Sequence, residues 1–348
     1  MTTEAVDIAS SVGATCLARA IYRDGAGELH LNWPLDRLGE AVRSGAGTLW
    51  LDIENQADVP CSVAERILRE VFRFHPLAVE DALRETHVPK IDDWDGYLYL
   101  VFHASRIDPE TDDLRLQELD VFLGPNYLVT YHEEPLEFLT DARRAIEADP
   151  RDRMKDGADH LLFRFLDRSV DQSLDAIETL DDRIDDLQDA MMSRMGPETL
   201  QQIFRIKRAA IQLQKNFAPQ RDVLNKLARD PYKVVQEKHR VYFRDVYDHI
   251  VRIHDISEGL RDLIAGTLDT YLSVISNRTN EIMKTLTVVT VMFLPMSFIT
   301  GFFGMNFFGG PLELDVWMPK WIMFFGSLFA MVLSPVAILA MLKRWGWF

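Results

Sequence analysis

The chain has 348 residues, with 54 acidic and 38 basic side chains and a formal net charge of −16. This acidic excess disfavours binding to nucleic acid or anionic lipid, and it favours cations as partners. Cys16 and Cys61 are too few for a disulfide framework, so we expect both to be ordinary packing residues.

Residues 1–150 are predicted to form a domain of strands and helices. The strand-like runs are rich in β-branched and aromatic residues, and Gly124-Pro125-Asn126 is typical of a hairpin turn. Because helical runs do not alternate regularly with strands, we expect a mixed sheet with helices packed on it. The strand-like runs are Thr15–Ile21, Thr48–Ile53, Tyr97–Ser105, Leu116–Leu123 and Tyr127–Tyr131, and the helical runs are Ser62–Phe72 and Leu136–Ala148.

Residues 151–230 are predicted to form an acidic helical hairpin. Apolar residues recur every three or four positions in its first half, which is the pattern of an amphipathic helix, and Met195-Gly196-Pro197-Glu198 interrupts that helix. The acidic face is either a solvated surface or a region that attracts cations. The apolar positions are Val170, Leu174, Ile177, Ile184, Leu187 and Met191, and the acidic ones are Asp171, Asp175, Glu178, Asp181, Asp182, Asp185, Asp186 and Asp189.

Residues 231–303 are predicted to form one long helix. After Pro231 no proline occurs before Pro295, and only two glycines precede Gly301. Such a helix would be about 110 Å long at roughly 1.5 Å per residue. A helix of this length needs partners for its stability, so we expect an oligomer.

Two uncharged stretches near the C-terminus are long enough to cross a membrane. Thr285–Phe303 has nineteen residues and Trp321–Leu342 has twenty-two, whereas a bilayer requires about 20 apolar residues in a helix. Residues 285–303 are thus the membrane part of the long helix, residues 304–320 an external loop, and residues 343–348 a basic tail. The alternative is a pair of helices buried inside a soluble protein.

The charges beside the spans predict their orientation. Lys284 precedes the first span and Lys343-Arg344 follow the second, whereas the loop carries Glu313, Asp315 and Lys320. Both chain ends are therefore expected in the cytoplasm. The first twenty residues show no basic segment followed by an apolar core, so no secretory signal is expected.

One face of the long helix is predicted to line a pore. It carries small, hydroxyl and amide side chains, interrupted by the large apolar residues Met283 and Leu294, and Leu286 lies beside this stripe. Several copies with this face inward would enclose a path that gates by dewetting at the apolar positions, although the same small residues could simply pack helices together. The candidate pore residues are Asn280, Met283, Leu286, Thr287, Thr290, Leu294, Ser297, Gly301 and Gly304.

Short motifs flank the two spans. Thr279–Lys284 reads TNEIMK before the first span, Phe302–Phe307 reads FFGMNF at its end, and Lys343-Arg344-Trp345 follows the second. Together with His75–Asp81 (HPLAVED), these segments resemble the CorA family of magnesium and cobalt transport proteins over essentially the whole chain. The place of Gly304-Met305-Asn306 at the end of the first of two C-terminal spans makes the resemblance specific.

The resemblance implies an α+β fold and a channel function. The expected molecule is a homopentameric funnel, with an N-terminal mixed α/β cytoplasmic domain and a long stalk helix that continues into the first of two C-terminal transmembrane helices. It would mediate passive uptake of Mg²⁺, with Co²⁺ and Ni²⁺ as further ions, across the inner (plasma) membrane of a prokaryote. Its partners would be further copies of the chain, membrane lipid and hydrated divalent cations. Neither nucleic acid nor an organic cofactor is expected.

The resemblance also assigns roles to individual residues. Gly304, Met305 and Asn306 would form a selectivity filter that hydrogen-bonds the waters of Mg²⁺, an ion that dehydrates reluctantly. Glu313 and Asp315 would concentrate cations at the outer mouth, although an insertion at residues 307–310 leaves the role of Glu313 open. Regulatory metal sites would pair Asp81 with Asp269 of a neighbouring subunit, with Glu80 and Asp245 nearby, and filled sites would hold the channel closed.

Three other functions agree less well with the sequence. The chain has no G-x-x-x-x-G-K-[ST] loop, no G-x-G-x-x-G motif and no H-E-x-x-H pair, so an enzyme is not expected. A zinc transporter of the ZntB type would share the architecture, but Met305 favours the magnesium branch. A membrane-anchored scaffold or sensor that transports nothing would not need a polar helix face.

Overall fold

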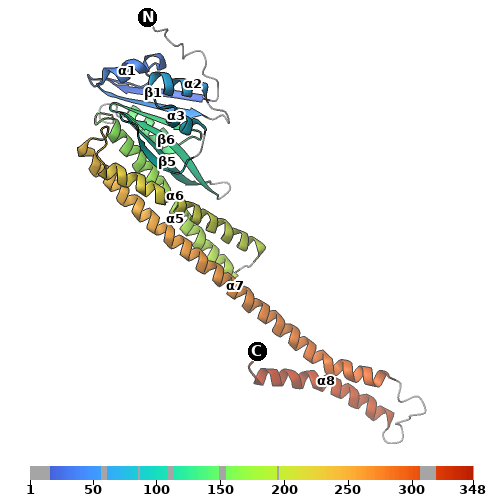
Figure 1. The fold of residues 1–348 in the computed structure, drawn as a ribbon. Helices are drawn as coiled ribbons and strands as arrows, with labels where there is room; N and C mark the ends of the chain where they lie inside the picture. The colour runs from blue at the N-terminus through green and yellow to red at the C-terminus, as the bar shows by residue number, and fades with distance from the viewer. Residues whose placement is uncertain are drawn as a thin grey trace. The chain divides into compact units, whose positions relative to one another are not determined.

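The computed structural model describes residues 16–55, 61–84, 87–108, 113–148, 154–193, 196–305 and 319–347. Its contacts divide the chain into two units, one ending at Thr267 and the other beginning at Leu268. The first unit holds the sheet and most of the helices, and the second holds the apolar C-terminal helices; Figure 1 shows these elements.

The first unit is built on a mixed sheet, as expected. Among the described residues the strand order is β2-β1-β3-β7-β6-β5-β4. Strands β3 and β7 are parallel, and the other neighbours are antiparallel. The strands are β1 (Cys16–Arg23), β2 (Leu29–His30), β3 (Thr48–Asn55), β4 (Lys90–Asp93), β5 (Leu98–Ile107), β6 (Leu114–Leu123) and β7 (Tyr127–His132).

Helices cover both faces of this sheet. Successive side chains of a strand point to opposite faces, so Leu49 and Leu51 join the core beneath the short helices α1 to α3, whereas Trp50 packs against Phe165 on the other side. The helices of the first layer are α1 (Leu38–Ser44), α2 (Ser62–Arg66) with a π-helical turn at Ile67–Val71, and α3 (Pro76–Arg84), and a 3-10 turn at Leu35–Arg37 precedes α1. The other face carries α4 (Glu137–Ala148) and α5 (Ala158–Ser193).

The turn between β6 and β7 follows from its residues. The Gly124 amide donates to the Tyr127 carbonyl at 2.9 Å. A Cβ at Gly124 would lie 2.1 Å from the Tyr127 ring, so a side chain there would clash. The Asn126 side chain donates to the Ala41 carbonyl at 3.0 Å, which fixes the turn to the end of α1.

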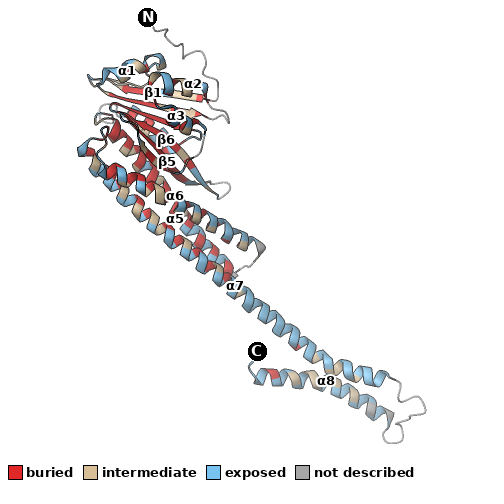
Figure 2. Ribbon diagram, in the orientation of Figure 1, coloured by how far each residue is buried: buried red, intermediate tan, exposed pale blue. Residues whose placement is uncertain are grey.

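Helix α5 is followed by α6 (Pro197–Arg229), in the segment expected to be an acidic hairpin. Pro197 stands at the start of α6, where its missing N–H group is tolerated. Of the six apolar positions, Leu174 is half-buried and the others are buried, and all eight acidic positions are exposed (Figure 2). The amphipathic pattern therefore marks the packed face.

The long helix α7 runs over Arg240–Gly304, so it begins nine residues later than residue 231. Pro231 precedes a stretch that contains a 3-10 turn at Glu237–His239. The buried His239 contacts the buried Asp159 at 2.8 Å between Nδ1 and Oδ2, which ties this stretch to the start of α5. A tertiary contact thus delays the helix start.

The two cysteines do not behave as ordinary packing residues. Cys16 and Cys61 form a disulfide, which corrects the expectation from the sequence. Cys16 begins β1 opposite Asn55, the last residue of β3, and Cys61 lies six residues further at the N-cap of α2. Strand pairing thereby brings the two Cα atoms to 6.3 Å, within the range that a disulfide spans.

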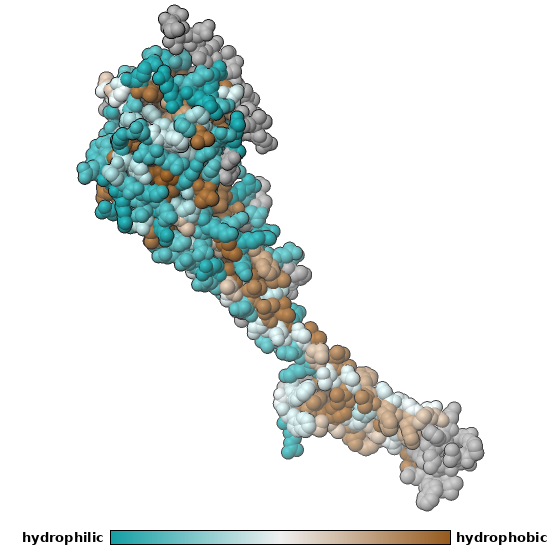
Figure 3. Space-filling model, in the orientation of Figure 1, coloured by the Kyte–Doolittle hydropathy of each residue, from teal (hydrophilic) through white to brown (hydrophobic). Residues whose placement is uncertain are grey.

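The second unit consists of apolar, exposed helices. It holds the end of α7 and α8 (Lys320–Arg344), and brown hydrophobic side chains cover this part of the surface (Figure 3). Among the described residues, the helical segments Glu237–Gly304 and Phe324–Arg344 are long and apolar enough to cross a membrane. Only 6% of the apolar window of each is buried, which is the opposite of a helix in a soluble core.

Candidate functional site

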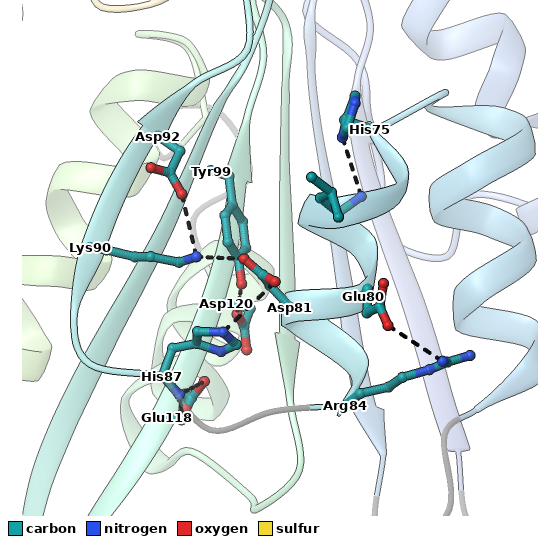
Figure 4. A network of polar contacts seen from close by, with 11 residues as sticks. His75, Glu80, Asp81, Arg84, His87, Lys90, Asp92, Tyr99, Glu118 and Asp120 are labelled. Carbon is teal, nitrogen blue, oxygen red and sulfur yellow. Dashed lines mark hydrogen bonds and ion pairs between the residues drawn. The ribbon is translucent and has the colours of Figure 1, made fainter.

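Helix α3 places two candidate ligands, Glu80 and Asp81, at the surface of the first unit. Its buried face, which includes Val79 and Leu83, packs against the sheet. His75, which directly precedes α3, is fixed in position because its backbone amide donates a hydrogen bond to the Tyr97 hydroxyl at 2.8 Å. The carboxylates then lie on the less buried side of a fixed helix (Figure 4).

Asp81 is paired within its own protomer. Its Oδ2 atom lies 2.5 Å from the Lys90 ammonium, and its Oδ1 atom lies 3.8 Å from Nε2 of His87. Lys90 also lies 3.4 Å from Asp92. Burial lowers the pKa of Lys90, but the hydrogen bond and charge of Asp81, followed by Asp92, outweigh this and raise it.

A buried carboxyl group lies beneath this pair. The Tyr99 hydroxyl donates to Asp120 at 2.5 Å, and the Lys90 ammonium lies 5.3 Å from the centre of the Tyr99 ring. Burial raises the pKa of Asp120 well above its ordinary value, and the nearby Glu118 charge raises it further. The environment therefore favours the neutral form of Asp120.

Sequence reasoning did not find Lys90, Tyr99 or Asp120. One signal was present, because Asp120 interrupts an apolar strand between Leu119 and Val121, where a carboxylate would be buried. Nothing in the local pattern connects that strand with Lys90 or with Asp81. Their proximity follows from the pairing of β4, β5 and β6 and from the position of α3.

The other candidate ligands have different neighbours. Glu80 lies 3.7 Å from Arg84 on the same helix and is half exposed. Asp245 is exposed on α7 and lies close to Asp167, whose pKa is raised by burial, by Asp171 and by Asp245 itself. Asp269 is exposed and belongs to the second unit. Together with Asp81, these three carboxylates are oxygen donors, the ligand type that Mg²⁺ prefers.

The predicted pore face is exposed throughout the described part of α7. Every candidate from Asn280 to Gly304 has an exposed side chain or backbone. The Thr287 hydroxyl donates to the Met283 carbonyl at 2.7 Å, and the Thr290 hydroxyl donates to the Leu286 carbonyl at 2.8 Å. Because these hydroxyl hydrogens are used inside the helix, the oxygens present acceptor lone pairs outward.

Three of the predicted site residues lie outside the described part of the chain. They are Asn306, Glu313 and Asp315. The motif is therefore described only for Gly304, which ends α7, and for the exposed Met305 that follows it.

Asp24, Glu28 and His30 form another group of ligand-type side chains, at the β1–β2 hairpin. One ligand atom from each lies within 4.8 Å of the others. The Asp24 carboxylate also accepts the amides of Ala26 and Glu28, and the latter hydrogen bond is the main cause of its lowered pKa. The hydrogen bonds of the hairpin turn therefore explain why these three side chains lie close together.

Comparison with known proteins gives a consistent result. A family model described as CorA-like Mg²⁺ transporter protein matches residues 45–344. The cobalt/magnesium transport protein CorA of Thermotoga maritima is 34% identical over 267 residues, which cover 76% of this chain and 75% of that protein. The putative metal ion transporter YfjQ of Bacillus subtilis is 30% identical over 321 residues, which cover 92% and 95%.

A solved structure shares the fold. The complete CorA magnesium transporter from Methanocaldococcus jannaschii matches with a TM-score of 0.75 at 21% identity, covering 95% of this chain and 99% of that chain. The expected combination of a mixed α/β domain, a long helix and two apolar C-terminal helices is therefore confirmed.

Proposed function

This chain belongs to the family of CorA-like Mg²⁺ transporter proteins, and from that premise we propose that it is a divalent-cation channel for the uptake of Mg²⁺. The observation that carries the proposal is the extent of the family match, which includes both apolar helices and the segment between them. Its relatives include transporters described for magnesium and for cobalt. The proposed channel spans the membrane with α7 and α8 and keeps both chain ends in the cytoplasm.

The proposed pore is formed by several copies of α7, five on the family pattern. The stripe from Asn280 to Gly304 faces the axis in this arrangement. Acceptor oxygens of Thr287 and Thr290 suit a cation that keeps its water shell, because those waters point their hydrogens outward. Met283 and Leu294 narrow the path with apolar side chains, which can dewet when the pore closes.

Selectivity is proposed to reside in Gly304-Met305-Asn306. A ring of Asn306 amides and backbone carbonyls would hydrogen-bond the waters of Mg²⁺ without stripping them. Glu313 and Asp315, repeated around the axis, would raise the cation concentration at the outer mouth. The transported ion is substrate, and no organic cofactor or enzymatic step is needed for this function.

Regulation is proposed to use Mg²⁺ on the cytoplasmic side. Asp81 of one subunit and Asp269 of the next would hold one cation, with Glu80 and Asp245 as a second position. These carboxylates, exposed except for the partly exposed Asp81, repel one another unless a cation neutralises them. Filled sites then favour the closed arrangement, and empty sites shift the population towards the open one.

The proposal is tested by flux measurements on the purified full-length chain in liposomes. Uptake of Mg²⁺, Co²⁺ and Zn²⁺ is compared for the wild type and for Asn306→Ala. We expect Mg²⁺ uptake by the wild type and its loss in the variant, because the amide is the only side-chain hydrogen-bonding group in the motif. Light scattering after size exclusion checks that the variant still assembles.

Two results would contradict the proposal. Near-normal Mg²⁺ uptake by an assembled Asn306→Ala variant would remove the residue from the filter. Uptake of Zn²⁺ without Mg²⁺ by the wild type would place the chain in a zinc-transporting branch of the same architecture.

A further inference from the structure

Lys90 lies on the sheet face that α3 covers. Residues two apart on a strand point to the same side, so Lys90 and Asp92 share one face of β4. Tyr99 is the partner of Asp92 on β5 and therefore lies on this face as well. Helix α3 carries Asp81 over the same face, and the four side chains meet there (Figure 4).

The Lys90 ammonium covers one of the two carboxylate oxygens that a cation at Asp81 could use. Nζ lies 2.5 Å from Oδ2 of Asp81, and Nε2 of His87 lies 3.8 Å from Oδ1. Asp81 is 28% exposed and Lys90 is 30% exposed, so a hydrated cation can reach the pair from solvent. Two positive groups repel one another at such distances, and a divalent ion at Oδ2 therefore requires the ammonium to move away.

The structure offers the displaced ammonium a second acceptor. Oδ2 of Asp92 lies 3.4 Å from Nζ, and the Lys90 ammonium also lies over the Tyr99 ring at 5.3 Å from its centre. A small rotation of the side chain can bring Nζ from Asp81 to Asp92 while the contact with Tyr99 is kept. The exchange thus replaces one ion pair by another and does not leave a charge unpaired.

We propose that Lys90 is a tethered competitor of Mg²⁺ for Asp81, and that it sets the Mg²⁺ concentration at which the regulatory site fills. The inference rests on the proposed regulatory role of Asp81 and adds a residue that determines its threshold. When Mg²⁺ is scarce, the ammonium neutralises Asp81. When Mg²⁺ is abundant, the ion takes Asp81 and the ammonium moves to Asp92.

The size of the effect follows from the strength of the pair that Mg²⁺ must break. A partly exposed ion pair with a direct hydrogen bond is weaker than a buried one and stronger than a fully exposed one. Removing the ammonium should therefore lower the Mg²⁺ concentration at half saturation about threefold to tenfold. Removing Asp92 should act in the opposite direction, because the displaced ammonium then has no second acceptor.

The test measures thermal unfolding of the full-length chain in detergent as a function of MgCl₂, at ionic strength held constant with KCl. A ligand that binds the folded state raises its stability, so the midpoint of this response reports site occupancy. The variants are Lys90→Gln, Lys90→Arg, Asp92→Asn and the double variant of Lys90→Gln with Asp92→Asn. Asp81→Asn tests the regulatory site itself.

Two substitutions serve as matched controls for charge. Lys233→Gln removes a lysine that pairs with the exposed Asp95 at 2.5 Å, and Asp93→Asn removes an acid next to Asp92 that points to the other face. Both should leave the midpoint within about twofold of wild type, because neither contacts the Asp81 carboxylate through a direct ion pair. Lys90→Arg keeps the positive charge and should also stay within about twofold.

The expected result is a lower midpoint for Lys90→Gln, a higher one for Asp92→Asn, and no effect of Asp92→Asn once Lys90 is replaced. If Asp81→Asn abolishes the stabilisation by MgCl₂ but Lys90→Gln leaves the midpoint unchanged or raises it, Lys90 is not a competitor, although the regulatory site at Asp81 is retained. If Asp81→Asn responds to MgCl₂ as the wild type does, both the competitor role and the regulatory site are wrong. If Lys90→Gln does not fold, the comparison of Asp92→Asn with its control Asp93→Asn decides. Equal MgCl₂ midpoints for these two variants would overturn the inference.

Discussion

Asp120 carries its carboxyl group inside the sheet of the first unit, where it accepts the Tyr99 hydroxyl at 2.5 Å. Burial raises its pKa well above the ordinary value. An acid whose pKa is raised in the folded state stabilises the protein at pH values below its pKa in the unfolded chain, which is about 3.9 for Asp. This contribution is lost as the pH rises through the pKa of the folded state. The wild type should therefore lose stability from this group above about pH 4.

Replacing Asp120 by asparagine should remove this pH dependence. The amide cannot ionise, and its oxygen can still accept the Tyr99 hydroxyl. We expect Asp120→Asn to match the wild type at pH 4 and to exceed it at pH 8, by about 1.4 kcal/mol for each unit by which the pKa is raised. Thermal unfolding between pH 4 and pH 8 measures this difference, and a stability difference between variant and wild type that does not change from pH 4 to pH 8 would contradict the raised pKa.

The hydroxyl groups of Thr287 and Thr290 form hydrogen bonds with the backbone of their own helix. Each hydroxyl donates to a carbonyl one turn earlier in α7. In lipid this satisfies a donor that would otherwise be costly. In a pore the same bond leaves an acceptor for the waters of a cation, so one local geometry serves both surroundings.

The disulfide acts at the scale of elements, since it joins the start of β1 to the start of α2. It closes a loop with a sequence separation of 45 residues and restricts the unfolded chain. Reduction should therefore lower the stability of the protein by about 2–4 kcal/mol.

A comparison of unfolding with and without dithiothreitol checks the effect of the disulfide. A variant with Cys16→Ser and Cys61→Ser is the control, and its stability should not respond to the reductant. An equal response of the wild type and the variant would show that the disulfide does not contribute.

Substitutions in helix α7 test the proposed gate. Met283 and Leu294 are exposed in the described structure and lie on the stripe of small and polar residues. We expect Met283→Ser to raise conduction severalfold at high internal Mg²⁺, because a polar ring would stay wet in the closed state. Flux recordings on an assembled preparation measure this leak.

The neighbouring Ile282 provides the matched substitution. It is also exposed but lies off the stripe, so Ile282→Ser should not raise the leak. If Met283→Ser reduces assembly and leaves the leak of intact oligomers unchanged, the stripe packs helices together and does not gate.

At the scale of the whole molecule, the proposed regulation requires more than one copy of the chain. Asp269 is exposed in the second unit and Asp81 is partly exposed in the first. We expect Asp269→Ala to weaken inhibition by internal Mg²⁺, because the shared cation would lose one of its two main ligands. Current decay and the protection of the chain from trypsin by Mg²⁺ are the two measurements.

Asp262→Ala is the control for this experiment. It removes an exposed acid seven residues earlier on α7, which pairs with Arg261 at 2.9 Å. Inhibition should remain normal in that variant. If Asp269→Ala shows the same decay and protection as the wild type, the regulatory assignment is wrong.

The sequence by itself determined the features that depend on neighbouring residues. The length and apolarity of two stretches predicted α8 and the end of α7, and periodicity predicted the buried face of α5. The motif at Gly304-Met305-Asn306 indicated the family because its position relative to the spans can be counted along the chain. Most strands of the sheet were also visible as β-branched and aromatic runs.

Only the tertiary structure decided which distant residues meet. The pair of Asp81 with Lys90, the contact of Asp120 with Tyr99 and the disulfide between Cys16 and Cys61 all arise from strand pairing and from helices packed on the sheet. Periodicity describes one element at a time, so it carries no information about such contacts. The short elements α1, α3, β2 and β4 were missed for the same reason, since packing against the sheet stabilises them more than their own sequences do.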